Sequence, residues 1–354
     1  MNTQPSYTIH NTNGTVKWSS PSNIALVKYW GKKGEQIPAN PSIRFTLNHC
    51  KSTTEVHYDI STERKQLEFS FLFEGKEKKS FEPKLQKFFE RIATHLPYLK
   101  HAKLEIHSEN SFPHSSGIAS SASAMSALSM CLVDIEQQLF SIPKTDVYTK
   151  ASYLSRLGSG SACRSVYPTL ASWGKHNLIE HSSDKFATPF TTCHEVFASY
   201  QDTVLLVDKG EKKVSSTVGH NLMINHPFAE RRFEQAHENL FQLKHILEKG
   251  DVENFIKLAE SEALTLHAMM MTSKDYYLLF MPNTIAIIHK IMSYREQNKV
   301  PVCFTLDAGA NVHVLYPEAY KQQVMDLIKN ELVAYCQNGE YICDEVGSGP
   351  EKLK

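Results

Sequence analysis

The chain has 354 residues, of which 41% are hydrophobic, and its 38 Lys and Arg residues balance 38 Asp and Glu residues. This length favours two domains, each able to bury a core of its own. A net charge of zero excludes the long-range positive field that attracts nucleic acids or acidic membrane surfaces, so an anionic ligand needs a local site.

The termini, cysteines and histidines narrow the class of protein further. No run of 18 apolar residues occurs, and the N-terminus lacks the basic start and apolar stretch of a secretory signal. The seven cysteines are odd in number and form no Cys-x-x-Cys pair, so we expect reduced, mostly structural thiols. The histidines show no metal-binding grouping. We therefore expect a cytoplasmic protein with no permanent transition-metal site.

The first half of the chain predicts strands followed by helices. Apolar residues alternate over residues 53–60 and 66–73, which indicates strands of an antiparallel sheet, and a polar turn follows at 74–79. Apolar residues at helical spacing from Leu85 to Leu96 predict a helix, and residues 102–107 predict another strand.

The second half begins after a polar stretch of little periodicity, residues 181–195. We place a domain boundary there, between residues 1–195 and 196–354. The pattern then predicts a strand at 202–208, helices at 233–247, 251–266, 284–295 and 318–335, and two strands around a turn within 302–316. Gly250 and Asp251 mark the end of one helix and the start of the next. This arrangement indicates an α+β fold in both halves.

A loop of small residues at 112–122, FPHSSGIASSA, opens a helix whose apolar face carries Met125, Leu128, Leu132 and Ile135. The unpaired N–H groups and the positive dipole end of a helix favour an anion, and small residues let a polyphosphate approach the backbone. The segment is therefore either a phosphate-binding loop or a Ser-rich helix start with ordinary capping.

Three further segments combine charged groups with tight turns. Lys28 lies in the apolar run NIALVKYWGKK; the run alone favours a lysine that reaches out to solvent from an edge, the alternative being a buried cation awaiting an anion. GSGSACRS, residues 158–165, is either a flexible loop or one that presents Arg164 as a clamp for carboxylate or phosphate. Asp307 precedes a glycine-containing turn, where it either caps the turn or, beside Lys28 and Arg164, stays ionised and deprotonates a hydroxyl.

The loop at 112–122 resembles the second signature of the galactokinase, homoserine kinase, mevalonate kinase and phosphomevalonate kinase superfamily. Together with NIALVKYWGKK, GSGSACRS and the DAGAN turn, it resembles the mevalonate diphosphate decarboxylases more narrowly. These four blocks span residues 23–311 in family order. Weaker similarity occurs at 216–219, 266–268 and 347–350.

The resemblance implies a two-domain fold of this kinase superfamily. The N-terminal domain would resemble the second domain of a ribosomal small-subunit protein, the C-terminal domain would be ferredoxin-like, and the active site would lie between them. It also implies ATP and Mg²⁺, a homodimer, and a step of isoprenoid biosynthesis by the mevalonate pathway. In that step ATP phosphorylates the tertiary hydroxyl of mevalonate diphosphate, and phosphate then leaves with carbon dioxide to give isopentenyl diphosphate.

The resemblance also implies roles for the residues found above. Asp307 would act as general base, Arg164 would hold the substrate carboxylate, and Lys28 would join them as a third catalytic residue. Tyr29, Ser159 and Ser161 would bind the substrate with Arg164. The ATP phosphates would be held by Ser116, Gly117, Ala119, Ser120 and Ser121, with Mg²⁺ also at Ser120.

The chain departs from the family pattern near the nucleotide and the diphosphate. The differences lie at 114–116, at Lys33 and Gly34, at 40–42, and at Arg44, where a small residue is common. His114 is either a phosphate ligand or merely a loop residue, and the latter is favoured. Alternatives are a mevalonate or phosphomevalonate kinase or decarboxylase acting on a less phosphorylated substrate, a sugar or homoserine kinase, and a silent nucleotide-binding protein.

Overall fold

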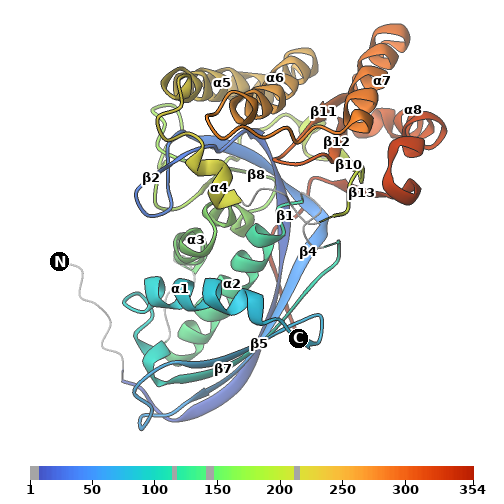
Figure 1. Ribbon diagram of the computed structural model, residues 1–354. Coiled ribbons are helices and arrows are strands. Elements are labelled where there is room, and N and C mark those ends of the chain that lie inside the picture. The colour runs from blue at the N-terminus through green and yellow to red at the C-terminus, as the bar shows by residue number, and fades with distance from the viewer. Residues whose placement is uncertain (1–7, 114–117, 141–146, 211–215) are drawn as a thin grey trace.

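A computed structural model of the chain describes residues 8–113, 118–140, 147–210 and 216–354 (Figure 1). Its strands are β1 (Thr12–Val27), β2 (Lys32–Lys33), β3 (Ile37–Pro38), β4 (Ser42–Ile60), β5 (Glu68–Phe73), β6 (Lys76–Glu77), β7 (Ala102–Asn110), β8 (Leu170–Trp173), β9 (Thr188–Pro189), β10 (Gln201–Leu205), β11 (Cys303–Thr305), β12 (Val312–Tyr316), β13 (Tyr341–Glu345) and β14 (Glu351–Leu353). Its helices are α1 (Glu82–Ile92), α2 (Ser120–Phe140), α3 (Val147–Gly158), α4 (Ser216–Asn221), α5 (Ala229–Lys249), α6 (Val252–Met271), α7 (Pro282–Asn298) and α8 (Lys321–Leu327), with a 3-10 helix, η4, at Gly160–Val166.

The larger sheet is built on two long strands, β1 and β4, which run along the molecule and pair antiparallel (Figure 1). Its order is β14-β1-β4-β7-β5-β6, and β8 pairs with the first residues of β4. The sequence predicted antiparallel pairing here, yet β5 and β7 are parallel. The reason is that α1 lies between them in the chain, and a crossover helix returns the second strand in the same direction.

The helices α1, α2 and α3 cover one face of this sheet (Figure 1). The predicted apolar face of α2 is confirmed, because Met125, Leu128, Leu132 and Ile135 are all buried in the core between helices and sheet. The α1 helix ends at Ile92, so Leu96 packs into the same core from the segment beyond it.

The smaller sheet has the order β11-β12-β10-β13, and α6 and α7 contact its edge strand β11. The predicted pair of strands within 302–316 is confirmed as the antiparallel pair β11 and β12. Gly250 ends α5 with φ of 74°, and the Asp251 side chain accepts a hydrogen bond from the Asn254 N–H at the start of α6. The predicted helix over 318–335 is broken: α8 ends at Leu327, and a wider π turn follows that keeps Ile328 and Leu332 buried.

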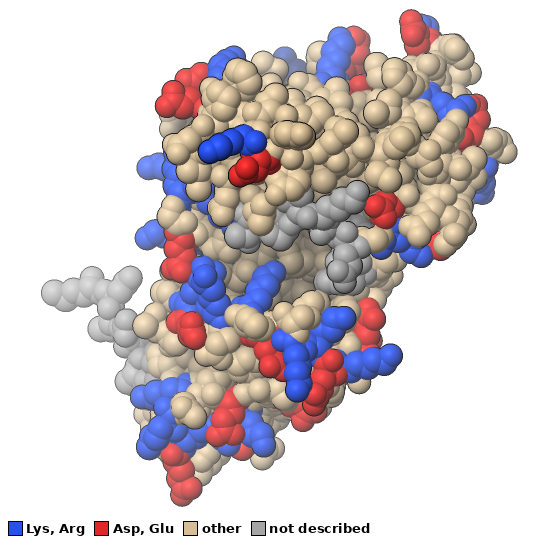
Figure 2. Space-filling view, viewed as in Figure 1, with Lys and Arg blue, Asp and Glu red and all other residues tan. Residues whose placement is uncertain are grey.

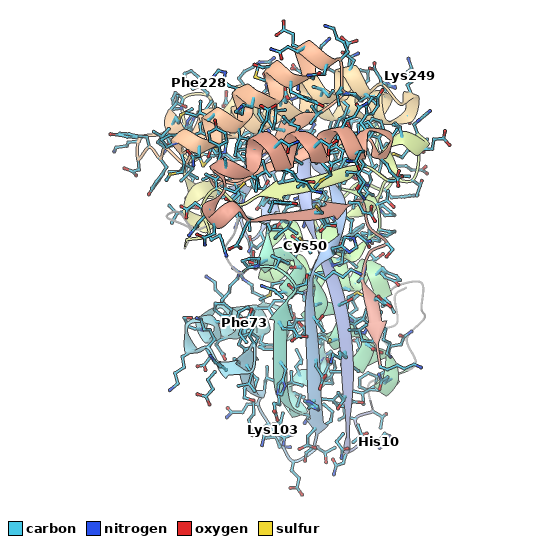
Figure 3. The ribbon with its side chains drawn as sticks, turned by 90° about the vertical axis from the view of Figure 1, so that its right-hand side faces the viewer. His10, Cys50, Phe73, Lys103, Phe228 and Lys249 are labelled. Carbon is cyan, nitrogen blue, oxygen red and sulfur yellow. The ribbon has the colours of Figure 1, made fainter. Side chains whose placement is uncertain are left out.

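The two sheets meet at the middle of β4. The buried Asp344 carboxylate, on β13, accepts hydrogen bonds from the backbone N–H groups of Asn48, His49 and Cys50 at 2.7 to 2.8 Å. Figure 3 shows Cys50 at this junction. After β13 the chain crosses back, so that β14 pairs with β1. The division of the chain near residue 195 stays a prediction. Within the described ranges, no helix is long and apolar enough to cross a membrane.

Candidate active site

A pocket of about 700 Å³ lies where the end of β1, the start of α2, η4 and the segment after β11 converge. Figure 2 shows the surface hollowed between the two parts of the molecule, with basic side chains near the rim. Every predicted site residue in the described ranges lines this pocket, namely Lys28, Tyr29, Ala119, Ser120, Ser121, Ser159, Ser161, Arg164 and Asp307. Ser116, Gly117 and His114 lie outside the described residues.

Lys28 follows the last residue of β1 and is only 2% exposed. Its Nζ lies 3.2 Å from Oδ1 of Asp307, a residue 279 positions further along the chain. Burial lowers the pKa of Lys28, and the Asp307 charge opposes that effect. The prediction that this lysine reaches out to solvent is wrong: it is the buried cation of the alternative interpretation, because β1 ends inside the molecule rather than at an exposed edge.

The backbone of Lys28 is held by a second ion pair, Arg232 with Glu262, which joins α5 to α6. The Lys28 N–H donates to Glu262 Oε2 at 2.8 Å, and Arg232 Nη2 donates to the Lys28 carbonyl at 3.2 Å. Both side chains of the pair are buried. The C-terminal helices therefore fix the position from which the Lys28 side chain enters the pocket.

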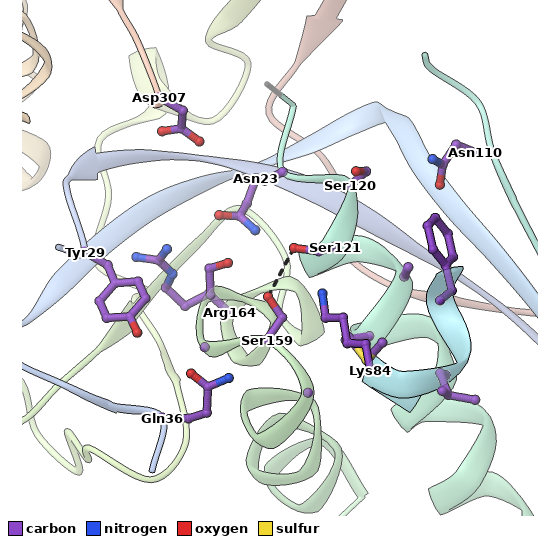
Figure 4. Close-up of a pocket in the computed structure, with 18 of the residues that line it drawn as sticks. Asn23, Tyr29, Gln36, Lys84, Asn110, Ser120, Ser121, Ser159, Arg164 and Asp307 are labelled. Carbon is purple, nitrogen blue, oxygen red and sulfur yellow. Dashed lines mark hydrogen bonds between the residues drawn. The ribbon is translucent and has the colours of Figure 1, made fainter. Parts of the chain in front are cut away.

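Asp307 lies two residues beyond β11, and its side chain is 26% exposed. Its carbonyl accepts a hydrogen bond from Nε2 of the buried His267 at 3.1 Å, and the His267 ring stacks on Phe280. Burial lowers the pKa of His267 to about 4, so this histidine is neutral and Nε2 carries the proton. The turn that carries Asp307 is thus tied to α6, while the carboxylate faces the pocket (Figure 4).

Arg164 lies in η4 and is 2% exposed. Its Nη1 donates to Ser42 Oγ at 2.6 Å, and its Nε has no hydrogen-bond partner in the described part of the chain. Behind it lies the fully buried Arg44, whose pKa is lowered first by burial and then by the Arg164 charge. A buried guanidinium with spare donors favours an anionic ligand such as a carboxylate.

Tyr29 supplies a neutral donor on the adjacent wall. Its ring lies 4.6 Å from the Trp173 ring, and its buried hydroxyl has no partner among the described residues. Burial raises the pKa of Tyr29, so the hydroxyl keeps its proton. Tyr29 is therefore placed to donate a hydrogen bond to a bound ligand.

The start of α2 brings small residues to the pocket. Ala119 has φ of 44°, and Ser120 and Ser121 are the first helical residues. Ser121 Oγ lies 3.3 Å from Ser159 Oγ, which joins the helix start to the loop that carries Arg164 (Figure 4). Polar groups of both segments thus converge on the same part of the pocket.

Several pocket residues escaped the sequence analysis: Asn23, Lys32, Gln36, Lys84 and His220. Burial, then the charges of Arg91 and Lys84, lower the pKa of Lys32 to about 8. Figure 4 shows Lys84 reaching from α1 toward Ser121 and Ser159. Lys32 stood in a segment already singled out, whereas nothing in the local pattern of α1 marks Lys84 as a pocket residue.

The pocket fits a magnesium ion that arrives with a nucleotide. No group of three or more His, Cys, Asp or Glu able to hold a metal occurs in the described ranges. Mg²⁺ typically keeps several waters and is bound through substrate phosphates with few protein ligands. The Ser120 hydroxyl at the helix start is an oxygen donor of the right kind for that arrangement.

Known proteins resemble this chain over nearly its whole length. Residues 20–186 match the family described as diphosphomevalonate decarboxylase-like N-terminal domain, and residues 203–352 match the mevalonate 5-diphosphate decarboxylase C-terminal domain. Diphosphomevalonate decarboxylase of Saccharomyces cerevisiae is 30% identical over 322 residues, covering 85% of this chain and 78% of the relative.

Two solved structures share the fold. Mevalonate diphosphate decarboxylase from Staphylococcus aureus has a TM-score of 0.82 and 28% identity, covering 97% of this chain and 99% of its own. MDDEF in complex with MVAPP, AMPPCP and magnesium has a TM-score of 0.81 and 24% identity, covering 97% and 100%. The two-domain α+β kinase-type fold is thereby confirmed. The chain belongs to the diphosphomevalonate decarboxylase family.

Proposed function

We propose that this protein catalyses the ATP-dependent decarboxylation of mevalonate diphosphate to isopentenyl diphosphate, with release of ADP, phosphate and carbon dioxide. The observation that carries the proposal is the convergence of Asp307, Lys28 and Arg164 on one pocket with the start of α2. Membership of the decarboxylase family favours this reaction over the kinase alternatives.

ATP binds with its phosphates at the start of α2, against Ala119, Ser120 and Ser121, and the proposal also assigns it Ser116 and Gly117, which lie outside the described residues. The helix dipole and the free N–H groups offset part of the phosphate charge there. Mg²⁺, with Ser120 as a ligand, supplies further neutralisation of the phosphates when bound. The MDDEF structure, which holds MVAPP, AMPPCP and magnesium, supports both as ligands of this fold.

Asp307 accepts the proton of the tertiary hydroxyl of the substrate, and the resulting oxygen attacks the γ-phosphorus of ATP. Lys28 Nζ, 3.2 Å from Asp307 Oδ1, attracts the negative charge of that carboxylate and helps to fix its position. Positioning and charge neutralisation dominate such a phosphoryl transfer.

Arg164 holds the substrate carboxylate, while Tyr29, Ser159 and Ser161 bind the rest of the substrate. The new phosphate ester then leaves with the electron pair of its C–O bond. The C–C bond to the carboxylate breaks, carbon dioxide departs, and that electron pair forms the double bond of isopentenyl diphosphate. Once the proton that Asp307 accepted has passed to the departing phosphate, the Asp307 carboxylate stabilises the positive charge that develops on the carbon.

The proposal is tested by the ratio of carbon dioxide to ADP that the protein releases. Incubation with ATP, Mg²⁺ and mevalonate diphosphate is expected to release carbon dioxide and ADP in equal amounts, measured by trapped ¹⁴CO₂ and a coupled ADP assay. Release of ADP without carbon dioxide would make the protein a kinase. If neither product forms, the proposed function is wrong.

The proposed setting is a homodimer in the cytoplasm, with domains divided near residue 195. This part rests on the resemblance to the family. Light scattering coupled to size-exclusion chromatography would measure the dimer, and a monomeric mass at micromolar concentration would contradict it.

A further inference from the structure

His220, in the short helix α4, forms part of the pocket wall that the reaction outlined above leaves unused. Its side chain is buried at 7% exposure. The imidazole ring lies 4.1 Å from the Tyr29 ring and 5.0 Å from the Trp30 ring, measured between centroids. These ring contacts fix the plane of the imidazole next to Tyr29 and Trp30.

A backbone group sets the tautomer of this histidine. The Gly31 N–H donates to Nδ1 of His220 at 3.1 Å, so Nδ1 has no proton. Burial, then the positive charges of Lys32 and Arg164, lower the pKa of His220 well below its ordinary value, which keeps the ring neutral. A neutral imidazole with an accepting Nδ1 carries its proton on Nε2, which is therefore a hydrogen-bond donor.

The Nε2–H of His220 has no hydrogen-bond partner within the described ranges. Beside it, the buried Tyr29 hydroxyl is a second neutral donor, and it has no hydrogen-bond partner among the described residues. Lys32 supplies a positive charge to the same wall of the pocket. Donors without acceptors next to a cation match an anionic group rich in oxygen atoms, because each N–H or O–H then gains an acceptor on binding.

We propose that His220 is a substrate-binding residue whose Nε2–H donates a hydrogen bond to an oxygen of the substrate diphosphate, beside Tyr29 and Lys32. This assignment rests on the proposed function, since it takes mevalonate diphosphate as the substrate. It gives His220 no part in proton transfer, because Nδ1 is occupied by Gly31 and the ring stays neutral. Its effect therefore falls on affinity for the substrate rather than on the chemical step.

Two variants separate the two ring nitrogens. The amide oxygen of His220→Asn can occupy the place of Nδ1 and accept from Gly31, but the shorter side chain has no donor at the place of Nε2. The longer His220→Gln can place its amide N–H there. Both variants lose the ring contacts with Tyr29 and Trp30, so each controls for the other.

Isothermal titration calorimetry with mevalonate diphosphate alone is expected to show a Kd about 10- to 100-fold weaker for His220→Asn, the effect of one lost hydrogen bond to a charged group. His220→Gln is expected to remain within about threefold of wild type. The Kd of AMPPCP and kcat at saturating substrate should stay within about twofold in both, because neither depends on the Nε2 donor.

The outcomes keep the two proposals apart. If wild-type protein forms no carbon dioxide, the proposed function fails before the variants are compared. If wild type is active and His220→Asn binds mevalonate diphosphate as tightly as wild type, only the role of His220 fails. Equal weakening of both ligands, or equal weakening by Asn and Gln, would mean that the ring acts through packing and would also overturn it.

Discussion

Two ion pairs act on Lys28, one through its side chain and one through its backbone, and the carboxylates of the two pairs differ in how deeply they are buried. In the core, Arg232 meets Glu262 through two hydrogen bonds, of 3.0 and 2.6 Å, and Asn239 and the Lys28 N–H also donate to this carboxylate. In the pocket, the Lys28 side chain meets Asp307 through a contact of 3.2 Å, and the Asp307 side chain is 26% exposed.

This difference in burial indicates which of the two carboxylates can form a new contact with a ligand. A fully buried, multiply bonded pair adds little net stability, since desolvation offsets its attraction, but it fixes geometry and is costly to break. A partly exposed carboxylate can accept a further hydrogen bond from a ligand while it keeps its contact with the buried lysine. The core pair therefore positions Lys28, whereas the pocket carboxylate is the one that a ligand can reach.

Neutralising the pocket carboxylate is expected to have the largest effect. Asp307→Asn removes the proton acceptor and is expected to lower kcat by about a thousandfold, within the range typical of general-base catalysis. The Kd of AMPPCP, measured by calorimetry, should be nearly unchanged, because in the proposed arrangement the nucleotide phosphates bind at the start of α2 and not at Asp307.

The control for Asp307→Asn is its thermal unfolding. We expect its Tm to fall by several degrees, because the buried Lys28 loses its carboxylate partner, so the rates are compared at a temperature where the variant is still fully folded. A variant that kept more than about a tenth of the wild-type rate, a difference worth only ~1.4 kcal/mol of barrier, would show that Asp307 is not the base.

Breaking the core pair is expected to lower the stability of the protein. Glu262→Gln leaves Arg232 as an uncompensated buried charge and is expected to lower the free energy of unfolding by about 3–5 kcal/mol, measured by urea denaturation. The double variant Arg232→Met/Glu262→Gln should recover part of this loss, because no unpaired charge remains. Additive losses in the double variant would show that the two side chains are not coupled.

Local physics was enough to predict the ends and faces of many elements. Gly250 and Asp251 punctuate α5 and α6 because a left-handed C-cap and an N-cap depend only on neighbouring residues. The buried face of α2 followed from helical spacing in the same way. The parallel pairing of β5 with β7 was missed, since alternation identifies a strand but not the direction of its neighbour.

The candidate site shows the limit of the same reasoning. Lys28 was expected to reach solvent, because its two carboxylate neighbours, Glu262 and Asp307, lie 234 and 279 residues away in sequence. The motifs placed Asp307 and Arg164 among the site residues through a resemblance, and the fold then brought them to one pocket. His220 and Lys84 reach that pocket from helices whose local pattern carries no sign of a ligand, so tertiary structure was needed to find them.

The pocket cation Lys32 is expected to make substrate binding depend on pH. The pKa of Lys32 is lowered to about 8, first by burial and then by the charges of Arg91 and Lys84. Below this pH Lys32 is a cation that favours the substrate diphosphate, and above it the charge is lost. We expect kcat/KM for mevalonate diphosphate to fall up to about tenfold per pH unit above that value, with kcat less affected. Lys32→Arg stays charged throughout, so its profile should remain level to higher pH. If kcat/KM of Lys32→Arg falls over the same pH range as that of wild type, another group is responsible for the pH dependence. Lys28 would be the next candidate, because burial lowers its pKa too.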